Sequence, residues 1–237
     1  MEKAIYWFSK NHVAANFLMV AVMSVVGAAW VWRTLPSGIR PPALSRAAWM
    51  QTLRSPALML CVGVTVLSAA GQFVLFSYFA PYWHHQLGAT PGELSLLFLA
   101  FGVAGLLGNV LMMRYIGRLG TDRAVMLGLG GIAISLLAWP LGVTLWTTVL
   151  VCIPWALGCF SSNSAQQARL VGLAPDLASA SVALNTSALY IGQAMGAAIG
   201  GWVIATGDFG LLSWVALVAL MAAMGVSALA RRTGHAH

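Results

Sequence analysis

Charged residues are scarce in this chain: Lys, Arg, Asp and Glu together make up 7% of its 237 residues, and only 5 residues are acidic. Soluble domains carry about 25% charged residues, so the chain lacks the side chains that a water-facing surface needs. Its hydrophobic residues, 60% of the total, lie in continuous runs without the alternation of a barrel wall. The composition predicts an all-α membrane protein with spanning helices of about 20 apolar residues each.

Cysteine is also rare, and Cys61, Cys152 and Cys159 all lie within apolar runs. Thiols at that depth act as small hydrophobic groups, so we expect no disulfide framework. No His or carboxylate joins them at ligand spacing, and the tail residues His235 and His237 are too few to predict a metal site. The chain also lacks an intramembrane nucleophile–base pair and a phosphate-binding glycine loop. We therefore predict no catalytic residues, no cofactor and no enzyme activity.

The net charge of +7 does not indicate nucleic acid as a partner, because the basic residues lie at the ends of apolar runs and not in a stripe with aromatics. Lys and Arg at such positions favour cytoplasmic loops. Connections 33–55, 114–123 and 169–177 and the C-terminus carry arginine, and the connections between them carry none. This alternation places those four segments on the cytoplasmic side.

Seven apolar segments are long enough to cross a bilayer. Between the first two, residues 33–55 hold three prolines, which interrupt helix, and Pro56 suits the first turn of the next helix. We predict an N-terminal transmembrane helix over 1–32, a cytoplasmic linker over 33–55, a six-helix bundle over 56–232 and a tail over 233–237. The segments are approximately 13–32, 56–83, 93–113, 124–146, 147–168, 178–206 and 210–230.

The first segment creates a conflict of orientation. Lys3 and Lys10 favour a cytoplasmic N-terminus, but a cytoplasmic 33–55 places them outside if 13–32 spans. Because four arginines oppose two lysines, we predict that the N-terminus lies outside, or that 13–32 spans poorly.

The stretch RYIGRLGTDR, residues 114–123, concentrates four charged residues in one connection. The arginines can serve as orientation signals alone, because an Arg at the bilayer centre costs about 2.5–3.5 kcal/mol. An acid adds little to orientation, however, and beside arginines it can form charge-assisted hydrogen bonds. The second interpretation is a gating or latch loop formed by Arg114, Arg118, Asp122 and Arg123.

The sequence GNVLMMRYIGRLGTDRAVMLG, residues 108–128, resembles the loop between helices eight and nine of major facilitator superfamily transporters. Residues 71–83 and 166–201 are similar to helix seven and to helices ten and eleven of the drug and sugar efflux branch. The resemblance covers about residues 25–232. It implies the second six-helix half of a twelve-helix, secondary-active antiporter in a bacterial inner (plasma) membrane, without the first half.

Two features depart from this pattern. Ala124 and Val125 stand where the family signature often has a glycine–arginine pair. The sequence AIYWFSKNHVAANFLMVAVM, residues 4–23, resembles instead the first transmembrane helix of resistance-nodulation-division exporters. The chain thus resembles a join between two families, which a natural fusion, an engineered chimera or a gene-prediction artefact would each produce.

The resemblance implies a central cavity lined by segments 56–83 and 147–168. In the first, polar and aromatic residues recur at three- and four-residue steps, which predicts one helical face. The Gln72 amide needs a hydrogen-bonding partner, either on another helix or in the cavity, and Tyr82 can alternatively anchor the headgroup interface. The predicted substrate-cavity residues are Gln72, Phe76, Phe79, Tyr82, Cys159, Asn163 and Gln167.

Small residues line two segments. Gly192, Gly196 and Gly200 form consecutive G-x-x-x-G steps, and Gly102, Gly105 and Gly108 thin one side of 93–113. Such faces allow helices to approach closely. They pack within the bundle or, because the resemblance puts these helices at the seam between bundles, against a second copy or a separate N-terminal half. Nearby, Asn185, Tyr190 and Gln193 are polar groups that must be satisfied inside the bundle.

The acidic residues lie at segment ends, and proton relays use intramembrane ionisable groups. The resemblance implies that such acids belong to the first bundle. The leading prediction is half of a transporter that exports small drug-like or sugar-like solutes, with the lipid bilayer and the solute as partners. The alternative is a non-transporting truncated or fused membrane module that needs a homodimer or partner bundle.

Overall fold

The computed structural model describes the backbone of residues 2–35 and 45–234 and the side chains of residues 17–35 and 45–232. Every regular element in these ranges is helical, and seven segments are long and apolar enough to cross a membrane. The chain divides into two compact units, residues 1–42 and 43–237. The prediction of an all-α membrane protein is therefore confirmed.

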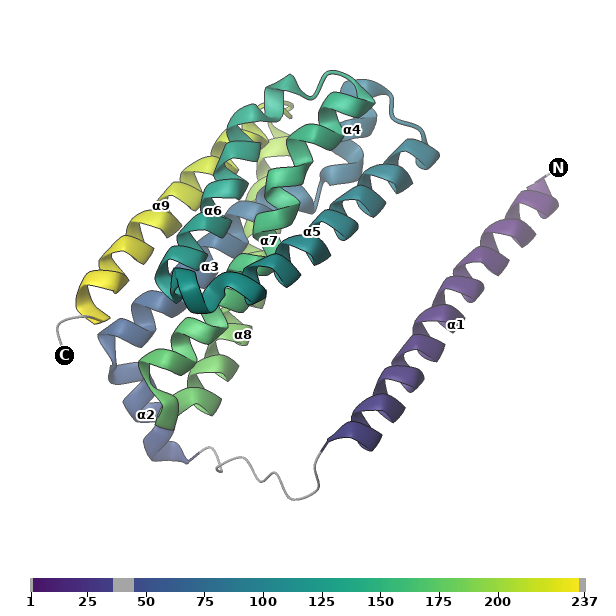
Figure 1. Cartoon of the computed structure of the whole chain (residues 1–237). Coiled ribbons are helices and arrows are strands. Elements are labelled where there is room, and N and C mark those ends of the chain that lie inside the picture. The colour runs from purple at the N-terminus through teal and green to yellow at the C-terminus, as the bar shows by residue number, and fades with distance from the viewer. Residues whose placement is uncertain (1, 36–44, 235–237) are drawn as a thin grey trace. The chain divides into compact units, whose positions relative to one another are not determined.

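The first unit contains α1, and the second contains the other described helices (Figure 1). Two short 3-10 turns, η1 and η2, follow α6 and α7. The bounds are α1 Glu2–Thr34, α2 Arg46–Arg54, α3 Pro56–Phe76, α4 Phe79–Leu87, α5 Pro91–Leu119, α6 Thr121–Ala138, η1 Trp139–Leu141, α7 Leu145–Leu173, η2 Pro175–Leu177, α8 Ala178–Ala205 and α9 Leu211–Gly234.

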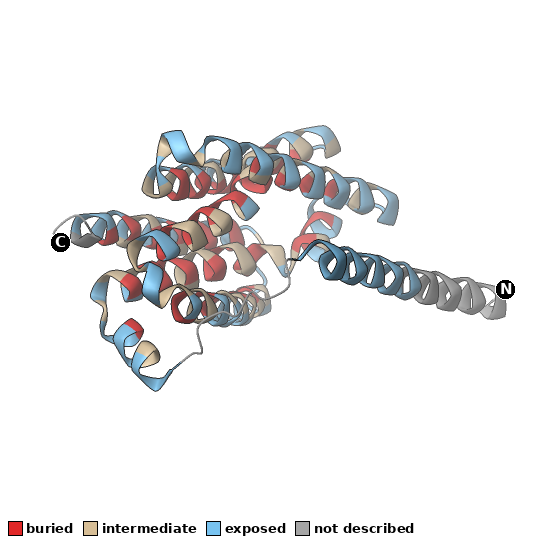
Figure 2. Ribbon diagram, turned by 60° about the horizontal axis from the view of Figure 1, so that its bottom comes forward, coloured by how far each residue is buried: buried red, intermediate tan, exposed pale blue. Residues whose placement is uncertain are grey.

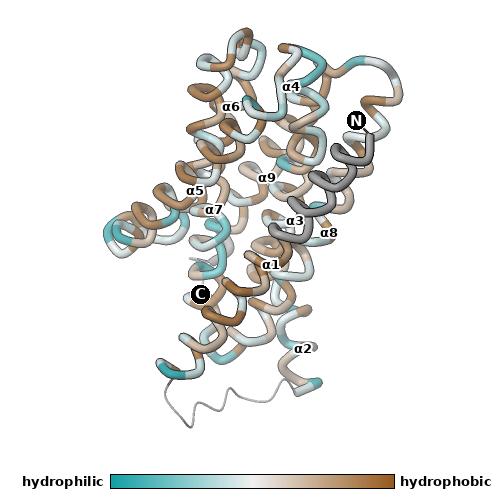
Figure 3. Tube along the Cα trace, turned by 90° about the vertical axis from the view of Figure 1, so that its right-hand side faces the viewer, coloured by the Kyte–Doolittle hydropathy of each residue, from teal (hydrophilic) through white to brown (hydrophobic). Residues whose placement is uncertain are grey.

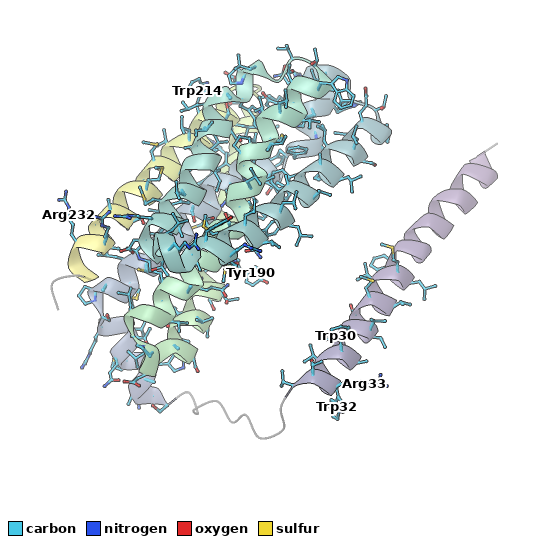
Figure 4. All side chains as sticks on the ribbon, in the orientation of Figure 1. Trp30, Trp32, Arg33, Tyr190, Trp214 and Arg232 are labelled. Carbon is cyan, nitrogen blue, oxygen red and sulfur yellow. The ribbon has the colours of Figure 1, made fainter. Side chains whose placement is uncertain are left out.

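The part of α1 whose side chains are described is predominantly apolar, and its residues, 17–35 with the turn that follows the helix, are all exposed. The span Phe17–Thr34 has a mean hydropathy of 1.6. Trp30, Trp32 and Arg33 cluster at its C-terminal end (Figure 4), a composition typical of a membrane–water interface. The side chains of Lys3 and Lys10 lie outside the described residues, so the predicted orientation of this helix remains a prediction.

The second unit is a helical bundle with its buried residues on the inner faces (Figure 2). Helix α3 packs against α8 and α9, α7 packs against α5 and α6, and α6 also packs against α9. Contacts between α3 and α7 are much less extensive. The two central helices therefore face each other across a space.

The predicted linker 33–55 contains a helix, α2, which sequence analysis missed. The Ser45 hydroxyl caps it by accepting a first-turn backbone N–H at 3.1 Å, and Ser55 separates it from α3. The side chain of Thr52 is fully buried, and α2 packs against α3 and α8. The three prolines that predicted irregular structure all precede Ser45, so the rest of the linker was free to fold onto the bundle.

The segment predicted as one helix over 56–83 is broken into α3 and α4 by a turn at Ser77 and Tyr78. Pro81 explains the break, because it has no N–H to donate to the Ser77 carbonyl and its ring crowds that oxygen. The Tyr78 hydroxyl then donates to the carbonyl of Ala197 on α8 at 2.9 Å. Tyr78, which was expected on a continuous helix, instead attaches the α3–α4 turn to α8.

The charged connection 114–123 is also shorter than predicted. Only Gly120 separates α5 from α6, and its φ of +78° lies in the region that glycine adopts without strain. Arg114 and Arg118 therefore lie on the last turns of α5, and Asp122 lies on the first turn of α6.

Five of the six predicted helix-packing glycines face neighbours within the bundle. A Cβ at any of the five would collide with α7, α3 or the ring of Tyr78, whereas a Cβ at Gly102 would meet open space. The interpretation of all six as a seam toward a second copy is therefore wrong, and packing within the bundle accounts for five. Those five are Gly105 and Gly108 against α7, and Gly192, Gly196 and Gly200 along α3.

Hydrophilic residues concentrate at the ends of the bundle, and hydrophobic residues follow the lengths of its helices (Figure 3). A cleft at one end is lined by Asp122 and Arg169, and a second cleft is lined by Asp208 and Trp214. Trp214 and Arg232 mark opposite ends of α9 (Figure 4). Arg123, Arg169 and Arg231 thus lie at one end of the second unit, as the alternation requires for three of the four arginine-bearing segments, and the cytoplasmic orientation of these segments remains a prediction.

Candidate functional site

A cavity of about 180 Å³, the central cavity, lies between α3 and α7, with further walls from α5, α6 and α8. Its lining combines aromatic rings with amides and hydroxyls, and among the described residues it includes no Asp, Glu, Lys, Arg or His. The polar and aromatic lining residues are Thr65, Ser68, Gln72, Phe73, Phe76, Phe101, Trp155, Phe160, Ser162, Asn163, Gln166 and Gln193.

Gln72 both lines this cavity and joins two helices. Its Oε1 accepts a hydrogen bond from Nε1 of Trp155 at 3.1 Å, and its Nε2 donates to the Ser68 carbonyl at 3.2 Å. The two interpretations of this amide, contact between helices and cavity lining, therefore hold together. The hydrogen bond fixes the Trp155 indole at the wall.

The position of Trp155 also depends on an irregularity in α7. Pro154 lies inside this helix and lacks the N–H that a regular turn requires. In the next turn, the Ser135 hydroxyl from α6 donates to the Val151 carbonyl at 2.6 Å and accepts from the Trp155 N–H at 2.7 Å. The hydroxyl thus bridges a pair of backbone groups that a regular helix bonds directly, and it ties α6 to the cavity wall.

Phe79 and Tyr82 do not line the cavity, contrary to the prediction of one continuous face. The α3–α4 break carries them into a buried aromatic cluster, where Phe79 is 1% and Tyr82 6% exposed. Both rings contact Trp83 and Trp139 in edge-to-face or tilted arrangements. Their burial also excludes the role of interface anchor considered for Tyr82.

On α7 the structure separates two neighbouring amides. Cys159 and Asn163 line the cavity as expected from their shared face, but Gln167 does not, and Gln166 takes that place. Gln166 is 3% exposed, and its Nε2 donates to the Cys61 carbonyl of α3 at 2.6 Å. Because 163 to 166 and 163 to 167 are both one-turn steps, spacing alone could not choose between them.

The polar residues of α8 have three different environments. Asn185 is 1% exposed and accepts a hydrogen bond from the Thr65 hydroxyl of α3. Gln193 lines the central cavity. Tyr190 is 64% exposed on the outer side of α8 (Figure 4), so the expectation that it is satisfied inside the bundle is wrong.

The acid in the charged connection has a partner that the sequence did not suggest. Oδ1 of Asp122 lies 2.6 Å from Nε of Arg169, whose side chain is 2% exposed. Nη1 of Arg169 also donates to the Ser227 hydroxyl at 3.1 Å. These three residues, hereafter the clasp, tie together α6, α7 and α9.

Arg169 was expected in a loop over 169–177, but α7 continues past it to Leu173. The predicted latch residues Arg114, Arg118 and Arg123 are exposed, and no ion pair to any of them is found among the described residues. Pairing with Asp122 allows Arg169, the charged residue of an otherwise uncharged helix, to be buried. Arg169 lies one helical turn after Gln166. This spacing could have indicated that Arg169 belongs to the same helix as the cavity residues.

Comparison with known proteins places these features in a family. Curated relatives from Salmonella paratyphi B, Salmonella typhimurium and Salmonella typhi, each described as a purine ribonucleoside efflux pump NepI, are 28% identical over 225 residues, which is 92% of this chain and 55% of each relative. The chain spans about half the length of the curated relatives it matches.

A family model described as Major Facilitator Superfamily matches residues 4–197 and 61–235. The first range includes residues 4–23, and the resemblance of that stretch to resistance-nodulation-division exporters gains no support from these comparisons. Because the two ranges together cover nearly the whole of a helical chain with a cavity between its central helices, the chain belongs to the major facilitator superfamily.

Proposed function

We propose that this chain contributes one bundle, the second six-helix half, of a secondary-active exporter of small neutral solutes. The observation that carries the proposal is the uncharged central cavity between α3 and α7 in a member of this family. An unpaired charge is costly in such surroundings, whereas rings and amides suit a neutral, partly apolar solute. The relatives are named for purine ribonucleosides, so nucleosides are the first candidates within the drug-like and sugar-like class.

The proposal needs a second bundle to complete the cavity. At about 180 Å³ the cavity is smaller than ligand pockets of roughly 300–1,000 Å³, which supports a site with a further wall. Helices α5 and α8 flank the cavity and expose large apolar side chains, among them Leu99, Leu106, Tyr190 and Trp202. Large exposed apolar patches are typical of lipid-facing or partner-facing surfaces. A second copy or a separate bundle would fit there.

The first unit has a different role in this proposal. We assign α1 to a transmembrane anchor, in keeping with the apolar composition of its described residues and its Trp30, Trp32 and Arg33 end. A cysteine introduced at Lys3 that reacts only with reagents added outside the cell would support the proposed orientation, and reaction from inside would contradict it.

We also assign energy coupling to the second bundle that would complete the cavity. The central cavity has no acidic lining residue among those described, and proton relays in transporters use intramembrane ionisable groups. We therefore expect that a single copy without a partner does not couple export to a proton gradient.

The test is export of radiolabelled inosine, alongside a panel of fluorescent dyes, from cells that make this chain alone or with a first-half bundle of a Salmonella relative. Export only in the second case supports a half-transporter, and export by the chain alone supports a homodimer. If neither strain exports any compound although both proteins reach the membrane, the chain is a non-transporting module and the proposal is wrong.

A further inference from the structure

Gln166 lines the central cavity and carries a buried hydrogen-bond acceptor that has no partner among the described residues. Gln166 is 3% exposed, and its Nε2 donates to the Cys61 carbonyl at 2.6 Å. A backbone carbonyl can only accept, so this contact fixes which end of the amide is which. The remaining atom, Oε1, has no hydrogen-bond partner among the described residues. Leaving a buried acceptor unpaired costs free energy until a donor reaches it.

A second amide lies one helical turn earlier on the same wall. Asn163 also lines the cavity, and its Oδ1 likewise has no partner among the described residues. Because no hydrogen bond to another described residue fixes the Asn163 side chain, its amide can turn to accept or to donate. Three residues of α-helix rise about 4.5 Å, so the two amides can address adjacent polar atoms on one edge of a ligand.

The rest of the cavity suits a flat ring. Phe76, Phe101 and Trp155 form part of the wall, with ring centroids 5.4–6.1 Å apart. Aromatic faces and edges pack favourably against a planar heterocycle. With no charged lining residue described, nothing in the cavity compensates a phosphate or an ammonium group.

We propose that Gln166 is a specificity-determining residue that selects neutral heterocycles with a ring N–H. In this arrangement the ligand N–H donates to Oε1 of Gln166, the polar atom beside it on the same edge bonds to Asn163, and the ring packs among the aromatic side chains. This inference rests on the proposed function and adds to it the chemical edge that is recognised. A site with a fixed acceptor rejects an otherwise similar ligand without the donor.

Water can fill the empty cavity before a ligand binds. At about 30 Å³ per water, the cavity has room for on the order of six waters. A ligand that displaces a bound water gains affinity only if it reproduces the hydrogen bond of that water. The donor-bearing ligand is therefore favoured even when the comparison is with a hydrated site.

The test compares two nucleosides that share the ribose and the bicyclic ring. Inosine has an N–H on its base, and purine riboside has no donor there. We measure their dissociation constants by isothermal titration calorimetry for the full chain in lipid nanodiscs, both alone and together with a first-half bundle of a Salmonella relative. Wild type should bind inosine roughly tenfold more tightly than purine riboside, because a buried acceptor is satisfied by only one of them.

Gln166→Met removes the acceptor at similar volume. It should raise the dissociation constant for inosine about tenfold, and leave that for purine riboside within about twofold. Gln167→Met is the matched control, because it changes the adjacent amide, which lies off the cavity wall, and should alter neither constant.

Three results would count against the account. Equal weakening of both nucleosides by Gln166→Met would mean that Gln166 acts only through the shape of the cavity, which overturns this inference but leaves the proposed function standing. No preference for inosine in the wild type would overturn it without any variant. Binding of neither nucleoside by a folded wild type would overturn the proposed solute class, and this inference with it.

Discussion

Helix α7 carries two polar groups one turn apart that are arranged in opposite ways. Arg169 is charged, and its guanidinium is held by Asp122 and Ser227 from two other helices. Gln166 is neutral, and half of its amide has no partner among the described residues. The difference separates structure from recognition within one helix. The charged side chain holds α6, α7 and α9 together, and the uncharged amide belongs to a residue that lines the central cavity.

The difference between the two side chains follows from the free energy that each costs to bury. A buried charge must be paired, or the penalty for removing it from water exceeds what the fold can supply. A neutral amide can remain partly unsatisfied at a much smaller cost. Of the two groups, only the amide can therefore stay partly unpaired until a ligand binds.

The largest expected effect comes from breaking the clasp. Asp122→Ala leaves the Arg169 charge buried without its carboxylate, and should lower the free energy of unfolding by about 3 kcal/mol. The measurement is reversible unfolding by SDS titration in mixed micelles. Arg118→Ala, on an exposed side chain of the same charged stretch, is the control and should change stability little.

A double variant sharpens this prediction. Asp122→Ala with Arg169→Met removes both charges and should recover at least half of the loss, since apolar groups of similar size can replace a buried ion pair. A double variant as unstable as Asp122→Ala alone would mean that the clasp charges do not act as a pair. Inosine binding should survive in the folded double variant, which separates the clasp from the cavity.

An intermediate effect is expected from crowding α7 without touching either polar group. A Cβ at Gly108 would meet the Leu157 backbone, so Gly108→Ala should destabilise the bundle by about 1–3 kcal/mol through overpacking. Gly102→Ala, one and a half turns away in open space, should instead stabilise it by about 0.5–1 kcal/mol, since alanine is the better helix former. Equal thermal shifts for the two variants in detergent would contradict the packing of α5 on α7.

The smallest effect on stability should come from the cavity side of the comparison. Trp155→Phe keeps most of the ring but removes the N–H that Gln72 accepts, and should cost about 0.5–1.5 kcal/mol of unfolding free energy. Thermal unfolding followed by circular dichroism measures it. Trp202→Phe, on a side chain that is 71% exposed, is the control. A loss as large as that of Asp122→Ala would show that the cavity wall is structural.

Much of the fold could be predicted because lipid imposes simple rules. Continuous apolar length gave the spanning segments, arginine placement grouped their ends, and Pro56 marked the start of α3 as it is observed. Two local irregularities are visible in the sequence as prolines but did not enter the prediction. Pro81 breaks the α3–α4 segment, and Pro154 disturbs α7. Helix α2 was missed because the three prolines lie in the first part of the linker and do not prevent helix formation after Ser45.

The site could be predicted only in part, because it depends on which neighbours meet. Gln72, Phe76, Cys159 and Asn163 line the cavity, but one-turn spacing could not distinguish Gln166 from Gln167. The partner of Asp122 lies 47 positions away in the chain, and no local pattern connects the two. Glycine spacing predicted close approach at five of the six positions, with Gly102 as the exception, but could not say toward which helix.

The central claim is that the space between α3 and α7 binds a neutral solute, and Cys159 on its wall reports on it directly. With Cys61 and Cys152 changed to alanine, we measure the rate at which N-ethylmaleimide alkylates Cys159 in nanodiscs. Inosine at about ten times its dissociation constant should slow the reaction roughly tenfold, and inosine monophosphate, which is charged, should not. An unchanged rate with inosine, or equal protection by the charged nucleotide, would contradict the account.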